Sequence, residues 1–307
     1  SILRVPITFP AEKFNGTLLS AMSVPDLNGS QGTYYYFSSD TNEQLTMTSG
    51  VRVPLEWTNG VARGVFTGPE NSLRAAGGEL SLPFEVRAGS NGHAELDLNG
   101  VVHPLKRREY TPWITLDFKP GLAMTVTGIV RFYLIETTPH LKLYMTPINI
   151  DPNQPALPIS HPFTYAIYLS KTQGRYSTLG LCEDTSALNE EVLDEDAFLQ
   201  QTYLIHEERE RMFFDALDKT SRGAVVCVFD ITDRLQHMFF RHLDERHPAN
   251  RGRTAKHKDV IRKLYIEMDA LVGRTMEAVD DETALLVMSD HGFKPFRRGV
   301  NLNTWLY

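Results

Sequence analysis

Two short segments of the sequence each bring a carboxylate and an imidazole close together along the chain. In the first, Asp233 and His237 are four residues apart, so on a helix they share one face and can bind the same ion. In the second, Asp290 and His291 are adjacent and precede Gly292, where a turn can bring both side chains to one point. Carboxylate oxygens and neutral imidazole nitrogens suit zinc, manganese or iron. The pattern therefore predicts a metal site that contains these four residues.

Each pair also has an ordinary structural explanation. An Asp and a His four apart on a helix are more often an exposed ion pair or a cap, and an Asp-His-Gly turn is common by itself. Asp230 is a reserve ligand or a strand-end cap, and Thr232 is the expected N-cap of the helix. His242 and His247, which lie among charged residues, are expected on a solvated surface. The metal hypothesis depends on finding both pairs, each directly after an apolar run.

The apolar runs predict the elements that position the two pairs. Residues 224–229 and 283–288 are continuously apolar, as strands buried on both faces of a parallel sheet are. Between them a helical stripe opens near Thr254, and residues 194–220 form another helical pattern before the first run. Strand, helix and strand at these lengths predict a βαβ unit of an α/β protein. Ligands of such sheets lie at the carboxyl ends of the strands, where both pairs occur.

Residues 50–150 differ from the rest of the chain because they alternate like strands and contain no helical stripe. Four turn signals divide them: Asn59-Gly60, Gly77-Gly78, Asn91-Gly92 and Asn99-Gly100. The sequence thus predicts an incomplete α/β metal-binding core, residues 1–49 and 151–307, with a β-rich antiparallel insertion at 50–150. The insertion is either a substrate-selecting cap or a stabilising or oligomer-forming appendage.

Composition limits the classes of function. Hydrophobic residues make up 42% of the 307 residues and charged residues 22%, which is typical of globular proteins. The formal net charge of −7 argues against a nucleic-acid scaffold. No apolar run approaches the roughly 18 residues of a membrane helix, so no transmembrane segment is expected. Two cysteines are too few for a disulfide scaffold. Compartment and oligomeric state stay open.

The two metal-ligand segments, together with three further stretches, resemble one known family. Residues 232–239 (TDRLQHMF) resemble the Asp-x-x-x-His metal segment of the type I phosphodiesterase/nucleotide pyrophosphatase branch of the alkaline phosphatase superfamily, and 289–293 (SDHGF) resemble its Asp-His-Gly segment. Further support comes from residues 4–10 (RVPITFP), from Val24-Pro25-Asp26 with Gly29 and Gly32, and from 300–306 (VNLNTWL). The resemblance spans the whole chain. It implies an alkaline-phosphatase-like core, with a mostly parallel sheet flanked by helices.

The resemblance also implies a ligand set for two divalent ions, zinc in the first place, with manganese or iron as alternatives. Asp233 and His237 would belong to one ion, together with a distal histidine. Asp290 and His291 would belong to the other, together with an early aspartate and a nucleophilic Thr or Ser. These last three groups have no matching positions in the sequence. The chain is therefore expected to be a central fragment of a longer enzyme and to be catalytically inactive when isolated.

The function implied by the resemblance is that of a metal-dependent phosphohydrolase or phosphodiesterase of the nucleotide pyrophosphatase type. Such enzymes perform two-metal phosphoryl transfer on a small-molecule phosphate ester through an enzyme-bound phosphoryl ester. Two alternatives stay open: a non-catalytic binding or scaffold protein on the same core, and a phosphomutase or sulfatase relative. Neither Cys182 nor Cys227 lies in the Cys-x-Pro-x-Arg setting of a sulfatase nucleophile.

Overall fold

The computed structural model describes residues 1–5, 15–71, 73, 77–121, 123–250, 254–295 and 298–306. The chain divides into two compact units, Ser1–Val228 and Phe229–Tyr307. Residues 6–10, which belong to the first stretch of the family resemblance, lie outside the described residues. No helix in the described part of the chain is long and apolar enough to cross a bilayer.

The first unit contains a small sheet whose central strands run parallel. Its order is β14-β2-β1-β15; β1 is parallel to both neighbours, and β14 is antiparallel to β2. The strands are β1 (Ile2–Val5), β2 (Leu18–Ser20), β14 (Ser160–His161) and β15 (Val226–Cys227). Leu3, Leu18 and Leu19 are buried. The parallel pairing confirms a mixed α/β chain, whereas the alkaline-phosphatase-like core stays a prediction.

Three helices belong to the same unit, and the longest confirms the helical pattern of residues 194–220. They are α1 (Thr164–Gln173), α2 (Thr185–Asn189) and α3 (Glu195–Asp218). Asp194 caps α3 because its side chain accepts a hydrogen bond of 2.9 Å from the amide of Ala197. The predicted stripe, including Phe198, Ile205 and Met212, is buried. Local capping and a regular apolar stripe thus fix this helix.

The β-rich prediction is also confirmed. Three antiparallel or mixed sheets have the orders β5-β6-β7-β8, β13-β10-β9 and β11-β12-β3-β4. Asn99 and Gly100, with φ of 52° and 85°, form the two-residue turn between β7 and β8. The strands are β3 (Tyr35–Ser38), β4 (Val51–Pro54), β5 (Val61–Glu70), β6 (Glu79–Ala88), β7 (Ala94–Leu98), β8 (Val101–Leu105), β9 (Ile114–Gly121), β10 (Met124–Val130), β11 (Phe132–Glu136), β12 (Lys142–Met145) and β13 (Asn149–Ile150).

Strand β3 connects the β-rich sheets to the helices. Tyr35 and Phe37 face a core that includes Phe66, whereas Tyr34 and Tyr36 face a second core that includes residues of α2 and α3. The alternation follows from the two-residue period of a strand. Although β3 precedes residue 50, it pairs with β12 of the predicted insertion. The predicted domain boundaries themselves stay a prediction.

Two carboxylates tie loops and strands to the helices of this unit. Buried Glu208 of α3 accepts hydrogen bonds from Trp113 Nε1 (2.7 Å), Arg131 Nη2 (2.8 Å) and the amide of Ser177 (2.9 Å). Glu190, just after α2, accepts four, from the donors Tyr34 Oη, Thr48 N, Thr48 Oγ1 and Ser49 N. Both carboxylates therefore hold together segments that are distant in the sequence.

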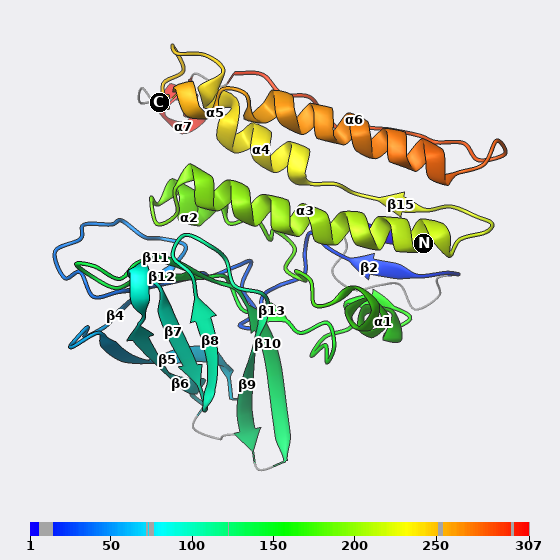
Figure 1. Ribbon diagram of the computed structural model, residues 1–307. Helices are drawn as coiled ribbons and strands as arrows, with labels where there is room; N and C mark the ends of the chain where they lie inside the picture. Colours follow the sequence, from blue (N-terminus) through cyan, green and yellow to red (C-terminus); the bar gives the residue numbers. More distant parts are fainter. Residues whose placement is uncertain are drawn as a thin grey trace. The chain divides into compact units, whose positions relative to one another are not determined.

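The second unit is helical in its described part. Its helices are α4 (Ile231–Phe239), α5 (Thr254–His257), α6 (Val260–Ala278) and α7 (Leu302–Leu306). Helices α4 and α6 pack side by side (Figure 1), with Leu235, Leu264 and Leu271 buried. The helix predicted to open near Thr254 is thus confirmed, although it is divided into α5 and α6.

The two predicted apolar strands are largely wrong. Within residues 224–229 the strand is limited to β15, and residues 283–288 form no strand. Leu286, Val287 and Met288 are instead 78%, 70% and 85% exposed. Apolar composition favours burial, but a strand forms only where another strand pairs along its edge. Among the described residues no strand pairs with this segment.

Candidate metal centre

Helix α4 places the first predicted pair on one face. Ile231, Leu235 and Phe239 point into the unit and are buried, which turns the opposite face of the helix outward. Asp233 and His237 lie on that outer face, with side chains 31% and 57% exposed. The predicted N-cap at Thr232 is wrong, because the helix begins at Ile231 after Asp230.

The second pair lies in a segment without helix or strand that bends at Asp290. The amide of His291 donates a hydrogen bond of 3.1 Å to Asp290 Oδ1, and Ser289 Oγ donates one of 2.6 Å to the carbonyl of His291. The imidazole Nε2 of His291 lies 3.7 Å from Asp290 Oδ2. These local bonds fix the backbone from which the imidazole projects.

The two pairs meet at one carboxylate oxygen. Asp233 Oδ1 lies 3.3 Å from Nε2 of His237 and 3.7 Å from Nε2 of His291. One oxygen of Asp233 therefore approaches imidazoles from both sequence segments, although the segments are more than fifty residues apart. Asp290, with a side chain 89% exposed, is connected to this group through His291.

Two further residues complete the surroundings of the four. Arg234 Nη1 lies 3.3 Å from Asp233 Oδ2, whereas both imidazole contacts involve Oδ1. The ring of Phe293 lies 4.9 Å from that of His237 and 5.3 Å from that of His291, both with steep interplanar angles. Sequence reasoning missed both roles. Their positions could have indicated these roles, because each residue lies next to a predicted ligand within a segment that resembles the family.

The donor set fits a divalent ion in its chemistry. Two ligand atoms bound at about 2.0–2.1 Å to one tetrahedral zinc ion lie about 3.3 Å apart. The separations of 3.3 Å and 3.7 Å around Asp233 Oδ1 are close to that value. Nevertheless, no group of three or more His, Cys, Asp or Glu side chains in the described part of the chain has the arrangement of a metal site. The assignment of these four residues as metal ligands therefore stays a prediction.

The other candidate histidines lie elsewhere. The prediction that His242 lies on a solvated surface is wrong: it is 1% exposed, with its ring 5.5 Å from Phe239 and 5.4 Å from His257. The apolar spacing of α4 continues into the turn that carries it, which explains the burial. His247 Nδ1 accepts a hydrogen bond from the amide of Ala249.

Comparison with known proteins gives one match. The family model described as type I phosphodiesterase / nucleotide pyrophosphatase matches residues 159–307, a range that contains α1 to α7 and all four predicted ligands. Residues 1–158, including the β-rich sheets, lie outside that match. No curated protein and no solved structure matches the chain. The family model thus confirms the resemblance predicted from the sequence over residues 159–307, just under half of the chain.

Proposed function

We propose that this chain is part of a metal-dependent phosphodiesterase of the nucleotide pyrophosphatase type. The family match over residues 159–307 suggests hydrolysis of phosphate esters, and that family is generally dependent on divalent metals. The observation that carries the proposal is the approach of His237 and His291, from two separate family segments, to one oxygen of Asp233. An exposed ion pair on a single helix would not need the second imidazole.

In this proposal Asp233 and His237 hold one ion, and Asp290 and His291 hold the other. Zinc fits the nitrogen and oxygen donors, as manganese or iron also would. The ions, when bound, would polarise phosphoryl oxygens. Arg234, beside Oδ2 of Asp233, would hold that carboxylate in place through its charge.

The ligand count indicates that further groups are needed. Four protein ligands serve two ions, whereas a catalytic zinc ion usually takes about three. We propose that the early aspartate, the nucleophile and the distal histidine of the family are not among these 307 residues, and that the chain alone is inactive. The family match favours ester hydrolysis over the sulfatase and phosphomutase alternatives.

The test measures Zn²⁺ binding by calorimetry and metal content by elemental analysis, with intact mass to confirm the chain. We expect the 307-residue chain to bind zinc weakly, and the variants Asp233→Ala and His291→Ala to bind it at least tenfold more weakly. Asp259→Ala is the matched control, since its carboxylate pairs with Arg262 at 3.2 Å on α6. Equal zinc binding by all four proteins would refute the assigned ligands.

The proposed inactivity of the isolated chain has its own test. We expect no turnover of a chromogenic phosphodiester above a metal-free control by the purified chain. Turnover, or two tightly held ions in the elemental analysis, would show that the missing groups lie within these residues. Either result would overturn the proposed inactivity but not the proposed ligands.

A further inference from the structure

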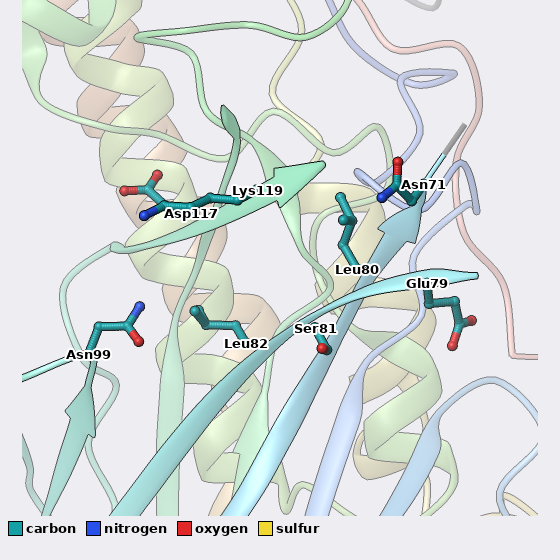
Figure 2. Close-up of a pocket in the computed structure, with 8 residues that line it drawn as sticks. All are labelled: Asn71, Glu79, Leu80, Ser81, Leu82, Asn99, Asp117 and Lys119. Carbon is teal, nitrogen blue, oxygen red and sulfur yellow. The ribbon is translucent and has the colours of Figure 1, made fainter. Parts of the chain in front are cut away.

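The β-rich sheets contain a cleft of about 400 Å³ beside β6 and β9, shown in Figure 2. Leu80 and Leu82, which line it, are 8% and 6% exposed and belong to the core that β6 shares with β9. Glu79, Asp117 and Lys119 give the rest of its lining charges of both signs. The cleft therefore selects no class of ligand. A more specific arrangement lies in the second unit, beside the four predicted ligands.

The ring of Phe293 makes three contacts, two of them with residues in or directly after helix α4. It lies 4.9 Å from the ring of His237 and 5.3 Å from that of His291, at interplanar angles of 85° and 60°. It also lies 6.1 Å from the ring of Phe240, in a stacked arrangement at 22°. All three separations fall in the range of about 4.5–7 Å over which aromatic rings attract each other. Phe293 thus joins both imidazoles to Phe240.

Phe240 is held in place by the end of a helix. It directly follows α4, and its carbonyl accepts a hydrogen bond of 3.1 Å from the amide of Leu243. Phe239 and His242, on either side of it in the chain, are each 1% exposed and anchor this turn in the unit. Because Phe240 comes three residues after His237, the two side chains lie on the same side of the helix end.

Phe293 is supported differently, because it lies in a segment without helix or strand. The ion contact between His291 and Asp233 at 3.7 Å connects this segment to α4, as do the ring contacts of Phe293. Where regular backbone pairing does not fix a segment, side-chain packing decides its position. A stack on the fixed ring of Phe240 therefore orients Phe293, and Phe293 in turn restricts both imidazoles.

We propose that Phe240 is a positioning residue of the candidate metal centre. Through Phe293 it holds the imidazoles of His237 and His291 in the orientation in which both approach Oδ1 of Asp233. The side chain of Phe240 carries no ligand atom, so it acts by packing alone. Its importance for metal binding rests on the proposed function, whereas its effect on the imidazoles needs no bound ion.

The first measurement is NMR of the metal-free 307-residue chain with ¹³C-labelled histidine. An aromatic ring shifts the signals of nearby protons, so the imidazole signals of His237 and His291 report the position of Phe293. The variants His237→Gln and His291→Gln assign the two signals. We expect Phe240→Leu to move both signals toward their values in Phe293→Leu, and Phe240→Tyr, which keeps the ring, to leave them in place. The signal of His206 on α3 should stay unchanged in every variant.

The second measurement is zinc binding by calorimetry. We expect Phe240→Leu to raise the Kd for zinc about 2- to 10-fold, which is the contribution of one aromatic pair. The double variant Phe240→Leu/Phe293→Leu should bind zinc as Phe293→Leu does, because the two rings act as one unit. Phe214→Leu is the matched control, since it removes a half-buried ring paired with Phe213 at 5.3 Å on α3, and it should leave the Kd unchanged.

Imidazole signals of His237 and His291 that do not move in Phe240→Leu overturn the proposal. So does a double variant whose increase in Kd equals the product of the two single increases, or an equal effect of Phe240→Leu and Phe214→Leu on zinc binding. Absence of zinc binding by the unsubstituted chain would instead contradict the proposed function, and the imidazole signals would still decide the role of Phe240.

Discussion

The buried carboxyl of Asp184 makes the stability of the chain depend on pH in a predictable direction. Tyr144 Oη donates a hydrogen bond of 2.7 Å to its Oδ2, and the amide of Ala187 donates one of 2.9 Å to its Oδ1, which caps α2. Burial disfavours the charged form more strongly than these bonds favour it. The pKa of Asp184 is therefore raised from 3.8 to about 6.

The direction of the effect follows from proton linkage. The folded chain binds the Asp184 proton more tightly than the unfolded chain, so this group contributes most to stability below its unfolded pKa. That contribution is lost as pH rises through the folded pKa. With values of 3.8 and about 6, the loss is about 1.6 kcal/mol at pH 5 and about 3 kcal/mol at pH 8.

The substitution Asp184→Asn removes the charge and retains a good N-cap. The substitution changes the free energy of unfolding, and we compare this change at the two pH values. We expect it to be about 1.4 kcal/mol more favourable at pH 8 than at pH 5. Any fixed cost of the amide against Tyr144 is the same at both pH values and cancels in this difference. The pH dependence is thus the informative quantity.

Urea denaturation at pH 5 and pH 8, followed by far-UV circular dichroism, gives the two free energies. Because the chain has two units, hydrogen exchange in residues 184–190 supplies a local measurement. Asp194→Asn is the control for the loss of a helix-capping carboxylate, because Asp194 also caps a helix but its side chain is 44% exposed. A benefit of Asp184→Asn that is equal at both pH values would refute the reasoning.

Three further predictions concern other carboxylates and the metal centre. Glu208→Gln should lower the free energy of unfolding by about 3–5 kcal/mol in urea denaturation, because the buried donors around Glu208 would then face the NH₂ group of a glutamine. The control is Glu207→Gln at an exposed position, which should change that free energy by less than about 0.5 kcal/mol. Burial raises the pKa of Glu190, but its hydrogen bonds outweigh burial and lower it to about 2. Its stabilisation is therefore full above the unfolded pKa of 4.5 and is lost as pH falls through about 2, so the cost of Glu190→Gln in thermal unfolding should shrink on acidification. Phe293→Leu should weaken zinc binding about 3- to 10-fold in calorimetry, since the ring contacts both imidazoles, whereas Phe163→Leu should not.

The sequence predicted best those elements whose causes are local. Helix α3 has its cap at Asp194 and its apolar stripe within one segment, so a short window of sequence contains what determines it. The Asn99-Gly100 turn is equally local, because only a few residue types adopt positive φ readily. Residues 283–288 show the opposite case. Their composition is that of a buried strand, but a strand depends on a partner that no nearby residue specifies.

The same distinction applies to the candidate site. The pairing of Asp233 with His237 follows from helical spacing and was predicted. The approach of His291 to Asp233 depends on how the chain returns after α6. It was expected from two strand ends at one sheet edge and from the family resemblance, but residues 283–288 form no strand. No periodic pattern in the sequence would reveal that the ring of Phe293 lies near both imidazoles.

The exposed apolar segment and the incomplete ligand set are connected by their positions. Met288, 85% exposed, comes two residues before Asp290. A parallel strand that paired with residues 283–288 would cover their apolar side chains, and its carboxyl end would lie beside Asp290 and His291. The groups that follow such a strand are then at the right edge to serve as ligands or as a nucleophile. Under the proposed function, a strand paired along this segment would therefore both cover its apolar side chains and bring further ligands to the same edge.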